Sequence, residues 1–175
     1  MEKSKNIWFP GKFIILLFFI NFFIISFKFT ILYSQVQQEW IRYYPAIFPE
    51  DMALDDSGNV YIAGIAANTR YIYFTIKYSP SGTILWVNDD SAGTVAKAIC
   101  VDKYHNVYVT GFRSNPQHDF CTIKYDQSGK RQWINYFDGP VHGEDEGEVI
   151  VVDNANNIYV SGLAKLPEGT MFLQQ

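Results

Sequence analysis

The sequence predicts an all-β chain made of repeated four-stranded units, preceded by an N-terminal hydrophobic helix. Short sequence blocks recur in one register, with intervals of 47 and 51 residues between Asp55, Asp102 and Asp153. Between the blocks lie short runs rich in β-branched and aromatic residues, separated by turn residues. No segment after residue 40 has a helical period, so strands account for the rest of the chain.

Residues 1–34 are predicted to be a signal peptide or a membrane anchor. Three lysines precede a 14-residue apolar run at 13–26, and a basic start before an apolar core is typical of a signal peptide. Extended to 13–33, the segment has 21 residues, enough for a membrane-spanning helix, although Lys28 within it is costly in a membrane interior. We therefore expect an exported protein, extracellular or in the cell envelope, that is cleaved after Ser34 or anchored by residues 13–33.

The main repeated block has the pattern D-x-x-x-N-[VI]-Y-[IV]-small-G, at 55–64, 102–111 and 153–162. Two more blocks follow in the same register: T-I-K-Y at 75–78 and 122–125, and G-x-x-x-W at 82–86 and 129–133. Three blocks in one register indicate a structural repeat. Its expected anchors are Asp55, Asn59, Tyr61, Gly64, Lys77, Trp86, Asp102, Asn106, Tyr108, Gly111, Lys124, Trp133, Asp153, Asn157, Tyr159 and Gly162.

Each copy is predicted to form four short strands, and regular hairpins with one Gly and one aromatic anchor are typical of β-propeller blades. We expect an incomplete propeller of about two and a half blades at 35–175. The expected elements are an outer strand at 38–44, blades at 50–89 and 95–137, and a partial blade at 146–175. The apolar first strand of each blade is expected to be buried on both faces, and the T-I-K-Y strand to have one polar face.

The turn after the first strand has a physical explanation. Gly58, His105 and Asn156 occupy the same position, three residues after the repeated Asp, and all three residue types enter the left-handed backbone region readily. Asp at the start of a turn accepts hydrogen bonds from backbone amides a few residues ahead. The repeated Asp and Asn residues are therefore expected to hold turns, because a catalytic residue is seldom needed three times.

These blocks resemble the SBBP repeat, which is named for a seven-bladed β-propeller and occurs in bacterial secreted and cell-surface proteins. The resemblance covers roughly residues 38–175 and rests on the Asp55–Gly64, Thr75–Tyr78 and Gly82–Trp86 blocks and on their second copy. It implies an extracytoplasmic scaffold or interaction propeller without general catalytic residues. A full ring at this period needs about 330 residues, so we expect the chain to be a piece of a longer propeller.

A second, partial resemblance is to quinoprotein propellers. Residues 126–133 are similar to the D-x-x-[ST]-G-x-x-x-W block of that family, whose buried Trp locks neighbouring blades. Ser79 replaces the Asp in the first copy, and no set of metal and quinone ligands is found in the sequence. This resemblance leaves one alternative open: a fragment of a propeller enzyme, quinoprotein-like or lyase-like, with its active site in other blades.

No residues outside the repeat form a recognisable catalytic or metal-binding motif. His105, His118 and His142 are isolated in the sequence. The acidic cluster Glu144–Glu148 offers oxygen ligands that suit Ca²⁺, but it has no EF-hand spacing and is expected to be a solvated connection. Cys100 is expected to stay unpaired with Cys121, because they fall on the first and third strands of one blade, about 9.5 Å apart.

The sequence therefore predicts a non-enzymatic module without catalytic, cofactor-binding or metal-binding residues. A net charge of −4 without a basic run gives no reason to expect nucleic-acid binding. The expected partner is a protein or a glycan, bound through the loops at 66–71 and 113–118. Any contact with a membrane is expected only through the N-terminal segment. Open blade edges are expected to favour self-association.

Overall fold

The computed structural model describes residues 38–174 apart from 68, 69, 115 and 168. Over these residues the chain is all-β, with eleven strands and no helix. Residues 38–175 form one compact unit. The predicted export segment and its hydrophobic helix lie outside the described residues, and no helix within the described part is long and apolar enough to cross a membrane.

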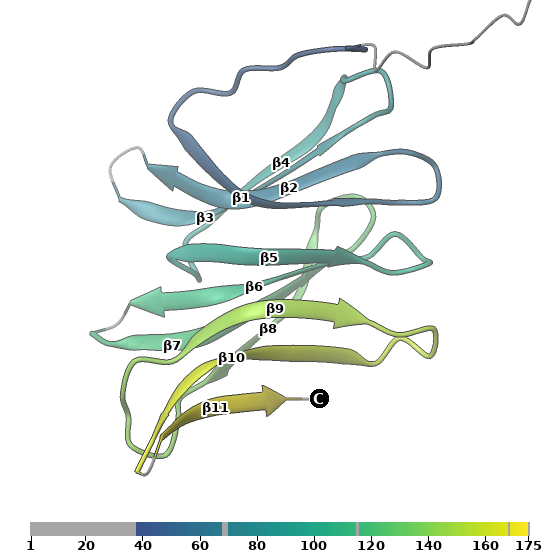
Figure 1. Ribbon diagram of the computed structural model, residues 1–175. Helices are drawn as coiled ribbons and strands as arrows, with labels where there is room; N and C mark the ends of the chain where they lie inside the picture. The colour runs from purple at the N-terminus through teal and green to yellow at the C-terminus, as the bar shows by residue number, and fades with distance from the viewer. Residues whose placement is uncertain (1–37, 68–69, 115, 168, 175) are drawn as a thin grey trace, which may run out of the picture. The chain divides into compact units, whose positions relative to one another are not determined.

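The strands form three antiparallel sheets, each with its strands in sequence order (Figure 1). Sheet one consists of β1 (Ile47–Leu54), β2 (Val60–Ala67), β3 (Tyr71–Tyr78) and β4 (Ile84–Asp90). Sheet two consists of β5 (Val95–Val101), β6 (Val107–Ser114), β7 (His118–Tyr125) and β8 (Arg131–Phe137). Sheet three consists of β9 (Glu146–Val152), β10 (Ile158–Leu166) and β11 (Gly169–Gln174). Sheet one begins three residues before the range 50–89 and ends one residue after it, whereas the strands of sheets two and three lie within 95–137 and 146–175.

The prediction of an outer strand at 38–44 is wrong, because this segment has no strand structure. It crosses the face of sheet one instead. The Trp40 ring lies 5.6 Å from the Tyr78 ring, and the Tyr44 ring lies 5.0 Å from the Phe74 ring.

The three sheets are stacked on one another, with the first strands β1, β5 and β9 adjacent along one side (Figure 1). Tyr61, Tyr73 and Ile123 belong to the buried cluster between sheets one and two. Phe120, Ile150 and Val160 belong to the cluster between sheets two and three. Within the described part, the core therefore lies between sheets and under the 38–47 segment.

Burial differs from the sequence prediction in two strand types. The first strands β1 and β9 are buried on one face only, because each has a neighbouring sheet on one side; Met52 of β1 and Val151 of β9 are exposed. The T-I-K-Y strands have no polar outer face. Thr75 and Lys77 of β3 are buried, because β3 is covered on both faces, by sheet two and by the 38–47 segment.

Candidate functional site

The three repeated aspartates each begin a tight turn between a first and a second strand. A backbone hydrogen bond closes each turn: Gly58 N–H to Asp55 O at 3.0 Å, with equivalents from His105 to Asp102 and from Asn156 to Asp153. The φ angles at the donor residues are 77° (Gly58), 63° (His105) and 65° (Asn156). The left-handed backbone expected at this position is therefore present in all three copies.

Each aspartate accepts four hydrogen bonds from its own hairpin. Asp102 Oδ1 accepts from Tyr104 N at 2.8 Å and from Asn106 N at 2.9 Å. Its Oδ2 accepts from Asn106 Nδ2 at 2.8 Å and from Tyr108 Oη at 3.0 Å. The same four donor positions serve Asp55 and Asp153. The D-x-x-x-N-x-Y pattern is therefore a closed turn whose carboxylate is fully engaged.

The ionised form of these carboxylates is stabilised. Burial raises the pKa of Asp102, but hydrogen bonds from Asn106, Tyr104 and Tyr108 outweigh it and hold the pKa below its usual value. Asp55 has the same balance, and its pKa is also lowered. A carboxylate whose pKa is lowered and whose oxygens already accept hydrogen bonds is a poor general base, because its affinity for a proton near neutral pH is low.

The repeated lysine lies inside the same cluster in the first two copies. Lys77 is 6% exposed; its Nζ lies 4.9 Å from the centre of the Tyr61 ring and 4.0 Å from Asp55 Oδ2. Lys124 Nζ takes the equivalent position, 5.2 Å from the Tyr108 ring. An aromatic face and a carboxylate both stabilise a buried ammonium ion. This arrangement accounts for the repeated lysine as part of the turn.

The glycine that ends each main block lies opposite a β-bulge. Gly64 pairs with Pro49 beside a register shift in β1, and Gly111 pairs with Ala96 beside a register shift in β5. Gly162 has the same setting between β10 and β9. A Cβ at any of the three would collide with a carbonyl oxygen of the first strand. These glycines are therefore required by close backbone approach, a role that the sequence pattern did not predict.

The repeated tryptophan joins one sheet to the next. Trp86 of β4 donates from Nε1 to Gln127 O at 3.1 Å, in the turn between β7 and β8. Its ring lies over Gly129, where a Cβ would come within 2.8 Å of Trp86 Cδ2. Asn88 adds a hydrogen bond from Nδ2 to Gly129 O at 2.7 Å. Trp133 has the equivalent place in sheet two, 6.1 Å from the Tyr108 ring.

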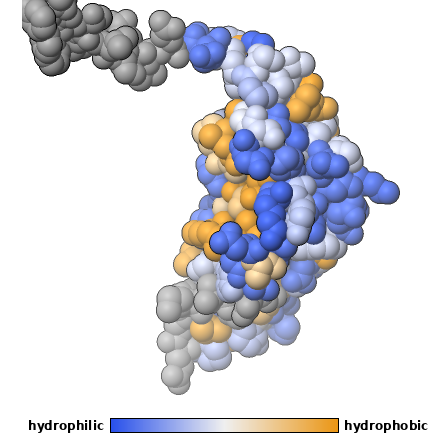
Figure 2. Space-filling model, turned by 90° about the vertical axis from the view of Figure 1, so that its right-hand side faces the viewer, coloured by the Kyte–Doolittle hydropathy of each residue, from blue (hydrophilic) through white to orange (hydrophobic). Residues whose placement is uncertain are grey.

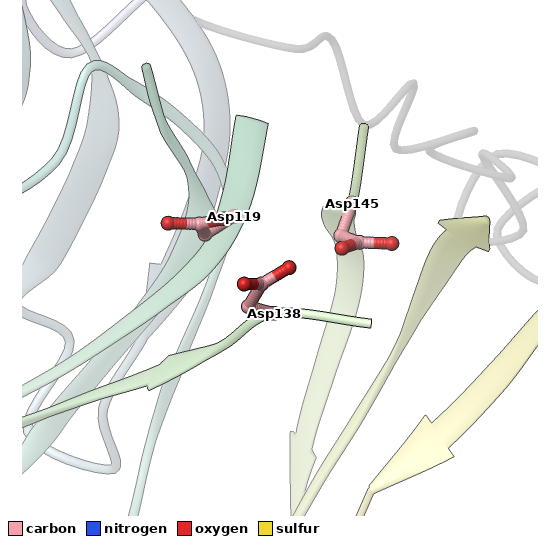
Figure 3. A group of neighbouring side chains, drawn as sticks. All are labelled: Asp119, Asp138 and Asp145. Atoms are coloured by element: carbon pink, nitrogen blue, oxygen red, sulfur yellow. The ribbon is translucent and has the colours of Figure 1, made fainter. Parts of the chain in front are cut away.

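Three carboxylates come together between sheets two and three (Figure 3). Asp119 lies in β7, Asp138 directly follows β8 and Asp145 directly precedes β9, and one oxygen from each lies within 4.8 Å of the other two. Oxygen donors of this kind suit a hard divalent cation. All three, however, have partners: Asp119 pairs with Arg113 at 2.9 Å, and Asp138 lies 2.7 Å from a His142 nitrogen.

Asp145 has a structural role within this group. It is fully buried, and it accepts hydrogen bonds from Gly139 N at 2.7 Å and from Lys165 N at 2.8 Å. Of the acidic stretch 144–148, only this residue belongs to the group of three. Glu146 and Glu148 instead face Lys97, at 3.7 and 3.5 Å. The acidic stretch 144–148, expected to be a solvated connection, therefore contains one buried residue, Asp145, which no sequence pattern distinguishes from its acidic neighbours.

The histidines each face one acidic group. His105 Nε2 lies 2.8 Å from Asp56, and His118 Nδ1 lies 2.6 Å from Glu146. The His118 ring also stacks on Phe112, with ring centres 4.0 Å apart. The pKa of His142 is raised by its hydrogen bond to Asp138. None of these pairs includes a nucleophile, so no acid–base relay is assembled among the described residues.

Both cysteines are free thiols, on the first and third strands of sheet two with β6 between them. Burial raises the pKa of Cys100 to about 12, and burial likewise raises that of Cys121 to about 12. A thiol is reactive as the thiolate, so these two groups are unreactive near neutral pH.

Comparison with known proteins does not assign the chain to a family. No family model matches the chain, and no curated protein matches it. Among solved structures, the chain is similar to a protein of unknown function from Bacteroides caccae, with 13% sequence identity and a TM-score of 0.49. The match covers 76% of this chain and 47% of that protein, so the chain spans about half its length.

Proposed function

We propose that the chain is an exported, non-enzymatic repeat module of the β-propeller type, akin to the SBBP repeat, that acts as an interaction scaffold at the cell surface. The observation that carries this proposal is the repeated turn. The polar groups of the repeated pattern bond to one another within the turn; for example, the Asp102 carboxylate accepts four hydrogen bonds from its own hairpin. A repeat whose polar residues serve its own fold is a building unit, and function then lies in loops and faces.

The sheet arrangement supports a propeller. Sheets one and two are four-stranded meanders in sequence order, and their first strands lie side by side with that of sheet three. Blades of a propeller have this internal order and place their first strands around a common axis. The Trp86 contact with the Gly129 turn links successive sheets at their outer strands. The same repeated unit stacked three times is what an arc of blades requires.

We assign the binding of a protein or glycan partner to the surface where β6 ends and β7 begins, near Arg113 and His118. Arg113 stacks on the Tyr136 ring at 3.9 Å, and both side chains remain partly exposed. His118 lies close by in sequence, at the start of β7. Aromatic and arginine side chains fixed in position are the residues that most often carry binding energy at interfaces.

Export can be tested directly. Residues 1–45 are fused to a reporter phosphatase that is active only after export, and the fusion is produced in a bacterial host. We expect full reporter activity, and loss of activity in the control with Leu16→Arg and Leu17→Arg, which breaks the apolar run. A wild-type fusion as inactive as this control would rule out export by this segment.

A further inference from the structure

The segment 38–44 holds the position of a fourth strand although it has no strand structure. Trp40 donates from Nε1 to Pro80 O at 2.9 Å, as Trp86 does to Gln127 O at 3.1 Å. Two residues later, Arg42 Nε donates to Gly82 O at 2.7 Å, as Asn88 Nδ2 does to Gly129 O at 2.7 Å.

The glycines of the two turns also match. Gly82 has φ 76° and Gly129 has φ 84°, and each lies directly under a tryptophan ring, Trp40 or Trp86. Trp86 belongs to β4, the fourth strand of sheet one, and its side chain contacts the turn of sheet two. The segment 38–44 therefore contacts sheet one in the way that the fourth strand of a preceding sheet would contact it.

Sheet three shows the complementary feature. Within the described residues it has three strands, and β11 is its edge next to the place where the other sheets have a fourth strand. The backbone of such an edge is open to pairing with another strand. Among the described residues, the segment 38–44 thus takes a fourth-strand position without belonging to a sheet, and sheet three has no strand in that position.

The two outer faces of the stack are apolar in matching places. The leading face, on sheet one, carries Met52 and Leu54, which are 60% and 64% exposed. Together with Ile62, Met52 lines a hollow of about 380 Å³. The trailing face, on sheet three, carries Val149 and Val151, which are 53% and 52% exposed. Figure 2 shows several hydrophobic patches on this side of the molecule, with hydrophilic side chains between them.

The repeat register shows what each face fits. Met52 corresponds to Ile99 of sheet two, which is buried against sheet one. Val151 corresponds to Ala53 of sheet one, which packs on the other side of that same contact. The leading and trailing faces are therefore the two halves of an interface that already exists inside the chain, between sheets one and two.

We propose that a second copy of this chain docks head to tail, with the trailing face of one copy on the leading face of the next. In this arrangement the segment 38–44 of the second copy lies along β11 of the first and becomes its fourth strand. The contact is continuous with the stacking inside each copy. The contact is heterologous, so two docked copies still have one free face of each kind. Further copies then extend the pair into an open chain or close it into a ring.

The test is a complementation between two variants of the full-length protein, each made with two different affinity tags and solubilised in the same mild detergent. Met52→Lys blocks only the leading face, and Val151→Lys blocks only the trailing face; each places a charge in an apolar contact. Copies of the same variant should co-purify at least about tenfold less than wild type. Copies of Met52→Lys mixed with Val151→Lys should co-purify like wild type, because one intact face of each kind remains.

Leu54→Glu with Val149→Glu provides a second pair at the same faces. Tyr104→Lys is the matched control, because Tyr104 is 62% exposed in a turn away from both faces, and it should behave as wild type. Equal co-purification of all pairs, or of one variant with itself, would overturn the proposal, as would loss of binding in the mixed pair. All variants change exposed residues, and unchanged melting temperatures verify that they fold.

Discussion

Removal of the Asp102 carboxylate is the sharpest test of the turn assignment. Asp102 is 5% exposed and accepts a hydrogen bond from the hydroxyl of Tyr108, which is 2% exposed. In Asp102→Ala the Tyr108 hydroxyl loses its partner in a buried place, which costs about 1–3 kcal/mol. The donors at Tyr104 and Asn106 are nearer to water and lose less. We expect a loss of about 3 kcal/mol in the free energy of unfolding, and a fall of roughly 10 °C in Tm.

A double variant separates this cause from general damage. Tyr108→Phe removes the hydroxyl that Asp102→Ala leaves unpaired, and replacing both partners of a hydrogen bond is less costly than removing one. Asp102→Ala with Tyr108→Phe should therefore be more stable than Asp102→Ala alone in urea unfolding followed by circular dichroism. If the double variant is less stable by the sum of both single losses, the hydroxyl is not the origin of the effect and the reasoning fails.

Three further predictions concern single groups. Thr75 Oγ1 is buried without a hydrogen bond because its cross-strand neighbour is Ala63, whereas Thr122 Oγ1 pairs with Thr110 Oγ1 at 3.0 Å. Thr75→Val should therefore stabilise the protein by about 1 kcal/mol and Thr122→Val should destabilise it by about as much, as measured by urea unfolding. Iodoacetamide near neutral pH should label neither Cys100 nor Cys121 in the folded protein and both in urea, as counted by mass spectrometry, because Cys121 is buried, Cys100 is half-buried and the pKa of each is raised to about 12. The pKa of Asp102 is lowered from 3.8, so its stabilising effect is complete above that value and is lost as the pH falls below it; in Asp102→Asn this acid loss of stability should be smaller.

The repeat blocks allowed the strands and turns to be predicted because both depend on local chemistry. The position occupied by His105 requires a left-handed residue, and the spacing from Asp102 to Asn106 and Tyr108 brings the donors to one carboxylate. These contacts lie within seven residues of sequence, so the pattern contains them in full. The repeat also includes Gly111, but the sequence does not show why glycine is needed there. The cause is a bulge in β5 at Ala96, fifteen residues away, whose backbone lies close to Gly111.

Burial was harder to predict because it depends on which sheets are neighbours. The run at 149–152 has the composition of a strand buried on both sides, yet Val149 and Val151 are exposed while Ile150 is buried. A similar run in β5 is covered from both sides, because sheet two has a sheet on each side. The apolar composition of a first strand therefore suits a sheet that has a neighbouring sheet on both faces. Its exposed residues in sheets one and three then mark the surfaces that such neighbours would cover, and this is the physical basis on which the head-to-tail contact is proposed.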